Sequence, residues 1–237
     1  MSFQAMSATT DGSTIVLSAG LKLIVVRRLL DDWSKWEVIL NLTSSIVFDN
    51  AILSGDGKML AVTCESGICV YRYNTSSASY KRIYTVPPVE GLVIEKLALS
   101  TGSEPLLVVS FDDLVESEKW SVATFNFTSG KQVWRYMTPK SSGQYADAAT
   151  SIAITPDGAY LSVGSFGDAD NINPQLHVFK GWGGDGTPII SHVCAGSVGA
   201  VEILVQNNVL TTIALGLHQH ENTGVTTGAI VAITQPI

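Results

Sequence analysis

Apolar and polar residues alternate along this chain, or form short apolar blocks that end at Gly, Asp, Asn, Ser or Pro. This pattern is typical of β-strands, and no stretch has the periodicity of a long amphipathic helix. The segment "AILSGDGKMLAVTCESGICVYRY" (51–73) shows the arrangement clearly. It contains an alternating strand, an Asp-Gly turn, a mostly apolar strand, and a third strand that ends in an aromatic residue. The pattern therefore predicts an all-β fold.

The same order of elements returns five times. The tight turns fall at Asp11-Gly12, Asp56-Gly57, Gly102-Ser103, Asp157-Gly158 and Asn207-Asn208, so successive turns are separated by 45, 46, 55 and 50 residues. A repeat of this length with about four strands is typical of β-propeller blades. The approximate repeats are 2–43, 44–88, 89–140, 146–194 and 197–237. Because the last has only three strands, we expect one propeller domain (1–237) with an incomplete fifth blade, alone or within a larger propeller.

Two stretches carry a resemblance to known proteins. "LSGDGKMLAV" and "ITPDGAYLSVGS" resemble the "SPDG-x-x-L-A-x-G" core of WD-repeat and quinoprotein-like β-propellers. The resemblance extends over most of the chain but concerns only the fold. The Trp-Asp dipeptide of WD repeats, the preceding Gly-His pair and the Trp-docking pattern of quinone enzymes are absent from the sequence. The resemblance therefore implies no cofactor site.

The loops after the second strand of blades 3, 4 and 5 are long and rich in polar residues. They read "FDDLVESEKW", "GDADNINP" and "LHQHENTGVTTG". In a propeller these loops share one face of the disc, and loops on a rigid scaffold commonly carry binding residues. We therefore predict an acidic binding face for a protein or glycan partner. Its candidate residues are Asp112, Asp113, Glu116, Trp120, Asp168, Asp170, Asn171, Asn173, His218, His220 and Glu221.

Part of this face has the residue types of a metal site. Asp168, Asp170 and Asn173 resemble the start of a calcium-binding loop, although the sixth-position Gly and the distal Glu of an EF-hand are missing. The alternative is a turn in which Asx side chains bond their own backbone. His218, His220 and Glu221 could hold zinc or copper, or the histidines could be solvated. Calcium and zinc are therefore the metal ions to test. Apart from these, no cofactor is expected.

The three cysteines cannot all pair with one another. A Ser66-Gly67 turn would place Cys64 opposite Cys69, with Cα atoms roughly 4.5 Å apart and within disulfide range. Two interpretations stay open: a disulfide, or two reduced and half-buried residues. Cys194 stands alone among strand residues and is expected in the core.

Composition narrows the classes of function. Hydrophobic residues make up 46% of the 237 residues, charged residues make up 15%, and the formal net charge is −7. A folded acidic chain without a basic stripe is not expected to bind nucleic acid. No apolar run is long enough for a membrane helix, so membrane insertion is not expected. No signal peptide is visible, but sequons occur at Asn41, Asn74 and Asn126. We expect a cytoplasmic protein if the chain is complete, and a secreted or cell-surface protein if it is a fragment.

The sequence contains no Gly-X-Ser-X-Gly elbow and no phosphate-binding glycine loop before a helix. The first hypothesis is therefore a non-catalytic binding scaffold. The alternatives are a metal-dependent hydrolase or lactonase, and a structural module of a larger extracellular protein. An open blade edge would also permit self-association.

Overall fold

The computed structural model describes residues 4–29, 32, 34–113, 119–138, 147–167, 173–181, 186–194, 196–219 and 226–237. Every regular element in these ranges is a β-strand, and they contain no helix that could cross a membrane. The chain forms two compact units, Met1–Glu90 (unit 1) and Gly91–Ile237 (unit 2).

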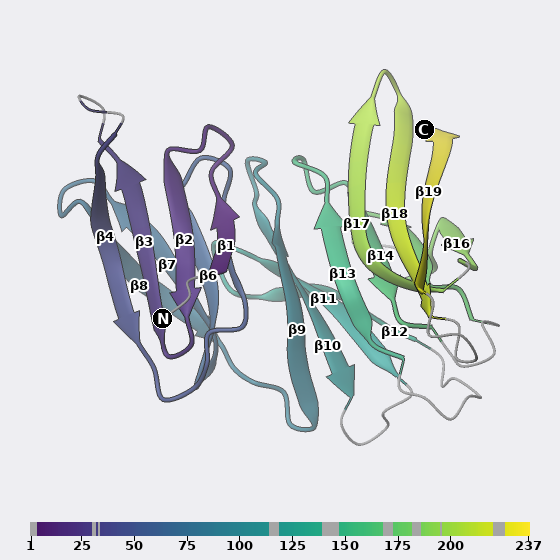
Figure 1. The fold of residues 1–237 in the computed structure, drawn as a ribbon, viewed down its shortest axis with the longest axis horizontal. Coiled ribbons are helices and arrows are strands. Elements are labelled where there is room, and N and C mark those ends of the chain that lie inside the picture. The colour runs from purple at the N-terminus through teal and green to yellow at the C-terminus, as the bar shows by residue number, and fades with distance from the viewer. Residues whose placement is uncertain are drawn as a thin grey trace. The chain divides into compact units, whose positions relative to one another are not determined.

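Unit 1 consists of two antiparallel sheets of four strands, which we call blades 1 and 2 (Figure 1). In both sheets, strands that follow one another in the sequence are neighbours. Blade 1 contains β1 (Gln4–Ala8), β2 (Thr14–Ala19), β3 (Lys22–Arg28) and β4 (Trp36–Thr43). Blade 2 contains β5 (Ala51–Leu53), β6 (Met59–Cys64), β7 (Gly67–Asn74) and β8 (Ser79–Val86).

Unit 2 has three sheets, blades 3, 4 and 5, again with sequential strand order. Blade 3 contains β9 (Leu92–Leu99), β10 (Leu106–Asp113), β11 (Trp120–Asn126) and β12 (Gln132–Met137). Blade 4 contains β13 (Ala149–Ile154), β14 (Tyr160–Ser165), β15 (Leu176–Lys180) and β16 (Ile190–His192). Blade 5 contains only β17 (Ser197–Gln206), β18 (Val209–Gln219) and β19 (Thr226–Pro236). The all-β prediction and the three-stranded last blade are confirmed, whereas the single-domain limits stay a prediction.

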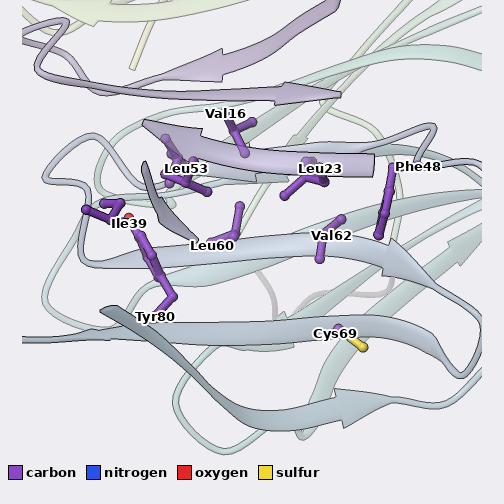
Figure 2. Packing of buried hydrophobic residues seen from close by; sticks show 11 residues of the cluster. Val16, Leu23, Ile39, Phe48, Leu53, Leu60, Val62, Cys69 and Tyr80 are labelled. Atoms are coloured by element: carbon purple, nitrogen blue, oxygen red, sulfur yellow. The ribbon is translucent and has the colours of Figure 1, made fainter. Parts of the chain in front are cut away.

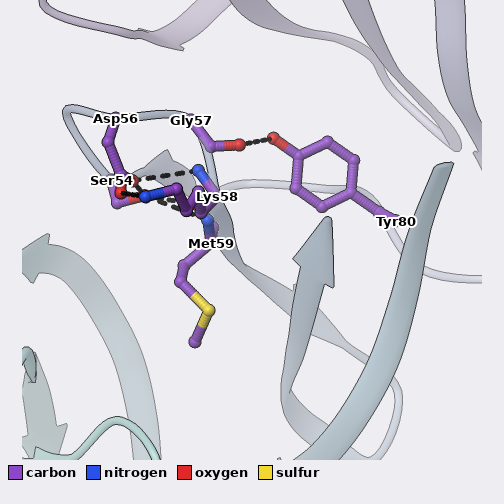
Figure 3. A network of polar contacts seen from close by, with 6 residues as sticks. All are labelled: Ser54, Asp56, Gly57, Lys58, Met59 and Tyr80. Carbon is purple, nitrogen blue, oxygen red and sulfur yellow. Dashed lines mark hydrogen bonds and ion pairs between the residues drawn. The ribbon is translucent and has the colours of Figure 1, made fainter. Parts of the chain in front are cut away.

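The first turn of blade 2 is held by its own side chains (Figure 3). The Ser54 hydroxyl donates to Asp56 Oδ1 at 2.7 Å, and the Lys58 backbone N–H donates to the same oxygen at 3.0 Å. Gly57 adopts a φ of 66°, a conformation that favours glycine. The Tyr80 hydroxyl of β8 donates to the Gly57 carbonyl at 2.5 Å. The Ser-X-Asp-Gly sequence thus determines the turn. The Tyr80 hydrogen bond then joins this turn to the outer strand β8.

The same turn recurs in blades 1 and 4. The Thr9 hydroxyl donates to Asp11 Oδ1 at 2.7 Å, and the Thr155 hydroxyl donates to Asp157 Oδ1 at 2.6 Å. Hydrogen bonds from the Ser13 backbone and then from Thr9 lower the pKa of Asp11 to about 2. The aspartate of this turn is therefore charged over the usual pH range and has a structural role.

The core of unit 1 lies between blades 1 and 2 (Figure 2). Val16 and Leu23 of blade 1 lie opposite Leu60 and Val62 of blade 2, and all four side chains are fully buried. These residues occupy alternate positions in their strands, so each strand turns one apolar face toward the other blade. The period-2 pattern in the sequence is the direct cause of this packing.

The described residues of unit 2 form clusters of the same kind between neighbouring blades. Between blades 3 and 4, Val108 and Val122 pack with Leu161 and Val163. Trp134 belongs to the same cluster, is 8% exposed, and its ring lies 5.2 Å from that of Phe179. Between blades 4 and 5 the buried residues are Tyr160, Val178, Ile203 and Leu210 in one cluster and Leu176, Cys194, Val198 and Ala214 in another.

Cys64 and Cys69 form a disulfide with a Cα–Cα distance of 6.0 Å. The predicted register of this hairpin is wrong by one step, because Cys64 pairs with Gly67 and Cys69 pairs with Val62. The turn is therefore Glu65-Ser66, and the two cysteines are diagonal neighbours. The reason is Gly67, where a Cβ would lie 2.1 Å from the Val86 carbonyl oxygen. Only glycine fits where β8 runs this close, so Gly67 belongs to the strand and not to the turn.

Candidate functional site

Two long loops of unit 2 are closed at their bases by backbone hydrogen bonds. Between β10 and β11, the Asp113 N–H donates to the Lys119 carbonyl at 3.2 Å. Between β14 and β15, the Ser165 N–H donates to the Gln175 carbonyl at 2.8 Å. The strands therefore hold the ends of both loops in place.

Asp147 joins these loop bases to the connection between blades 3 and 4. Its Oδ2 accepts a hydrogen bond from Trp120 Nε1 at 3.0 Å, and its Oδ1 accepts one from the Gly167 N–H at 2.8 Å. Trp120 begins β11, Gly167 follows β14, and Asp147 precedes β13. Asp147 is only 5% exposed, and both of its oxygens have a donor. The second-to-third loops of blades 3 and 4 therefore begin at one edge of unit 2, as expected for a propeller face.

Asp112 lies beside this network in β10, where its backbone pairs with that of Trp120 in β11. Its Oδ1 accepts a hydrogen bond from the Ala149 N–H at 3.3 Å. Burial raises the pKa of Asp112 from 3.8 to about 7, and the nearby charges of Glu95 and Asp147 act in the same direction. The protonated form of Asp112 is therefore favoured relative to that of an exposed aspartate. Glu95 lies where the β9–β10 register shifts, and this irregularity accompanies its approach to Asp112.

The base of the third long loop lies against blade 4. Thr150 Oγ1 is 3.1 Å from the Gly164 carbonyl oxygen and also donates to the carbonyl of Val198. Val198 is the second residue of β17 and pairs with Gly216 near the end of β18. The chain leaves β18 for the β18–β19 loop close to this point. Contacts between described residues therefore connect the edge across blades 3, 4 and 5.

Trp120 is not a ligand-binding surface, so its prediction as a binding residue is wrong. The side chain is completely buried, with its ring 5.5 Å from that of His177 and 5.8 Å from that of Tyr136. The reason is the bond from its indole N–H to Asp147, which holds the ring inside the blade interface. Trp120 therefore supports the base of the loop from inside the blade interface.

His177 was missed by sequence reasoning. It is 6% exposed, and its Nε2 lies 3.0 Å from the Pro174 carbonyl oxygen. Burial lowers the pKa of His177 to about 4, so the ring is neutral at physiological pH. Because His177 stands between apolar strand residues, the sequence gave no sign that it packs beside Trp120. Asp147, two residues before β13 in the connection between blades 3 and 4, was missed as well.

The remaining predicted residues have different outcomes. Asp113 and Asn173 are half-buried at the loop bases. His218 belongs to β18 and pairs with Thr227, so the assignment of His218 to a loop is wrong. Threonines 226 and 227 favour strand conformation, and they extend the hairpin to Gln219. Outside the described residues lie Glu116, Asp168, Asp170, Asn171, His220 and Glu221.

No group of three or more His, Cys, Asp or Glu side chains in the described ranges could hold a metal ion. The carboxyls of Asp112, Glu95 and Asp147 influence one another electrostatically without forming such a group. The predicted ligands Asp168 and Asp170 lie outside those ranges, so the calcium and zinc predictions stay predictions.

The fold resembles that of several solved propeller structures. A protein of unknown function from Desulfotomaculum acetoxidans matches 96% of this chain with a TM-score of 0.58 and 14% identity. The Dos1 propeller matches 86% with a TM-score of 0.59 and 12% identity. A chain of the Mitotic Checkpoint Complex matches 93% with a TM-score of 0.56 and 15% identity. A "putative 6-phosphogluconolactonase" from Bacteroides uniformis matches 95% with a TM-score of 0.60 and 14% identity.

These likenesses, together with the five sheets, define a β-propeller fold with an incomplete last blade. This chain corresponds to 68%, 50%, 63% and 70% of the lengths of those four structures, respectively. No family model matches the sequence, and no curated protein matches it either. At these identities the comparisons show the fold alone.

Proposed function

We propose that this chain is a non-catalytic binding scaffold that uses the loop edge of blades 3, 4 and 5 to bind a protein partner. The main support is the network in which Asp147 holds the bases of two loops and the blade connection together. A buried carboxylate with a donor on each oxygen makes a rigid base for the loops above it. The Mitotic Checkpoint Complex structure supports a protein partner, since a propeller of this fold is part of a protein assembly there.

The charge of the loops indicates the kind of partner. The loop sequences contain Asp113, Glu116, Asp168, Asp170 and Glu221, and the whole chain has a formal net charge of −7. An acidic surface attracts a basic surface at long range, and salt screens this attraction. The proposed partner is therefore a protein with a basic patch, and its affinity falls as the salt concentration rises. A glycan partner is the alternative ligand for the same loops.

The test compares a loop variant with a matched control in a quantitative pull-down from cell extract. The loop variant is Asp168→Asn with Asp170→Asn, which removes two carboxylates, as the control does. The control is Glu104→Gln with Glu202→Gln, since Glu104 lies between β9 and β10, Glu202 lies within β17, and both are exposed. We expect proteins retained by the unchanged chain and the control to be lost from the loop variant. Identical retention by all three forms would contradict the proposal, and a glycan array probes the alternative ligand.

The second candidate is a metal-dependent hydrolase or lactonase with Asp168, Asp170 and His218 or His220 as ligands. The observation in its favour is Asp112, since a carboxyl with a pKa of about 7 can transfer protons at neutral pH. The Bacteroides uniformis structure shows a propeller whose name refers to lactone hydrolysis. Elemental analysis of the purified protein, followed by a lactone hydrolysis assay with the metal found, tests this candidate. Stoichiometric calcium or zinc that Asp168→Asn removes would favour the enzyme over the scaffold.

The outer edge of blade 5 supports a proposal of self-association. β19 pairs with β18 over 11 residues without a bulge and has no charged side chain, and Ile230 is 75% exposed. Unpaired edges of this type add strands from other chains unless charges or bulges protect them. Ile230→Lys is expected to reduce any concentration-dependent dimer seen by light scattering. A dimer that persists unchanged in this variant would exclude the edge as the contact.

A further inference from the structure

The disulfide of unit 1 lies in the wall of a cavity of about 210 Å³. Besides Cys64 and Cys69, the lining includes Ser44, Phe48, Tyr71 and Arg82. The cavity lies between the end of blade 1 and the β6–β7 hairpin of blade 2. A small molecule that enters it would meet the disulfide directly.

The two sulfur atoms differ in their access to solvent. Cys69 is 2% exposed and belongs to the core cluster of unit 1, whereas Cys64 is only partly buried. An attacking thiolate must approach along the S–S axis, so it needs access to one sulfur only. Attack is therefore favoured at Cys64, the more exposed of the two cysteines.

The buried sulfur also has a cationic neighbour. Arg82 Nη1 lies 3.7 Å from Cys69 Sγ, close enough for a charge-assisted contact. Ser66 Oγ lies 3.4 Å from Cys64 Sγ and 4.0 Å from Cys69 Sγ. A guanidinium stabilises a thiolate and makes it a better leaving group. The residue that attack would release is thus the one prepared to carry the negative charge.

We propose that the Cys64–Cys69 disulfide is a thiol-exchange site for a low-molecular-weight thiol. The thiolate of the small molecule attacks Cys64 Sγ and forms a mixed disulfide. The Cys64–Cys69 bond breaks, and its electron pair goes to Cys69 as a thiolate beside Arg82. A second thiolate then attacks the small-molecule sulfur of the mixed disulfide. The bond to Cys64 breaks, Cys64 leaves as a thiolate, and the two small molecules are released as their disulfide. Two thiols are oxidised to one disulfide, the protein disulfide is reduced, and water or buffer supplies the protons that the cysteines retain.

The hairpin keeps its shape without the covalent bond, which makes the exchange reversible. The backbone pairs Val62–Cys69 and Cys64–Gly67 belong to the sheet ladder and do not depend on the sulfur atoms. Gly67 is confined by the backbone of Val86 and the residues that follow it. The two cysteines therefore stay close enough to pair again after reduction.

The experiment measures native-state reduction by 2-mercaptoethanol in a Cys194→Ser background. This thiol carries no charged group besides its thiolate, so no carboxylate or ammonium group of the reagent contributes to the rate. Arg82→Gln is expected to slow the reduction about three-fold or more. Lys81→Gln is the matched control, because Lys81 is the adjacent exposed cation and its side chain points to the other sheet face. Circular dichroism confirms that each variant is folded.

Trapping with glutathione disulfide tests which cysteine reacts. Cys69→Ser is expected to form a stable glutathione adduct on Cys64 within minutes, whereas Cys64→Ser is expected to form almost none on Cys69 in the folded protein. Equal adducts on both cysteines, equal rates for the Arg82 and Lys81 variants, or reduction only after unfolding would each overturn the proposal. This site lies in unit 1, so its failure would leave the proposed scaffold function of unit 2 unaffected.

Discussion

Asp112 is expected to make the stability of unit 2 depend on pH. Burial, the Glu95 charge and the Asp147 charge raise its pKa from 3.8 to about 7 in the folded protein. For a group whose pKa rises on folding, the stabilising contribution is fully present below the unfolded pKa and is lost as the pH rises through the folded pKa. Unit 2 therefore loses this contribution between about pH 4 and pH 7.

The size of the effect follows from the same two values. The full difference between 3.8 and about 7 corresponds to roughly 4 kcal/mol. Asp112 is only half-buried, so solvent screening reduces the expected change to about 1–2 kcal/mol. His177 acts with the opposite sign, because burial lowers its pKa to about 4 and its contribution is lost as the pH falls. The comparison therefore needs a variant that changes Asp112 alone.

Asp112→Asn is that variant, since the amide keeps an oxygen for the Ala149 N–H and cannot ionise. Chemical denaturation of both proteins at pH 5 and pH 8 gives the free energies of unfolding. The free energy of unfolding of the variant minus that of the unchanged protein should be about 1–2 kcal/mol larger at pH 8 than at pH 5. Glu104→Gln, at an exposed turn, is the control. An Asp112→Asn difference that is the same at both pH values would refute the reasoning.

Three further perturbations have defined outcomes. Trp120→Phe removes a buried hydrogen bond to a carboxylate and should lower the free energy of unfolding by about 1.5–3 kcal/mol, measured by urea denaturation. Gly67→Ala places a Cβ against backbone and should cost about 3 kcal/mol or more, whereas Gly20→Ala, with open space around it, should cost only about 1 kcal/mol. Asp168→Asn with Asp170→Asn should change the melting temperature little if the loop holds no cation. A large drop that a chelator reproduces on the unchanged protein would instead show a structural metal.

The strands and turns were the parts of this fold that the sequence made predictable. The reason is that their causes are local: alternation sets the buried face, and a Ser or Thr two residues before Asp builds the turn. Ser54 and Asp56 interact across two residues, and the sequence alone contains that information. The hairpin at Cys64 was misread because its register depends on Val86, which is 19 residues away from Gly67.

The candidate site was less predictable for the same physical reason. The sequence indicated which loops share an edge, but it gave no sign that Trp120 turns inward to meet Asp147, 27 residues later. It also gave no sign that Glu95 would approach Asp112, since this depends on a register shift within the sheet. A buried partner distant in sequence decides whether a polar or aromatic residue binds a ligand or supports the fold.

Two polar contacts between neighbouring blades span about one repeat of the sequence. The Leu53 N–H donates to the Ser7 hydroxyl across 46 residues, and Ser162 and Thr212 hydroxyls meet across 50 residues. Each bond therefore joins one repeat to the next, as in a linear lattice whose energy is a sum over adjacent elements. In such a lattice, unfolding begins at an end or at the weakest junction and proceeds stepwise. Heat should therefore melt this chain over a broad interval, with protection from hydrogen exchange graded from one blade to the next.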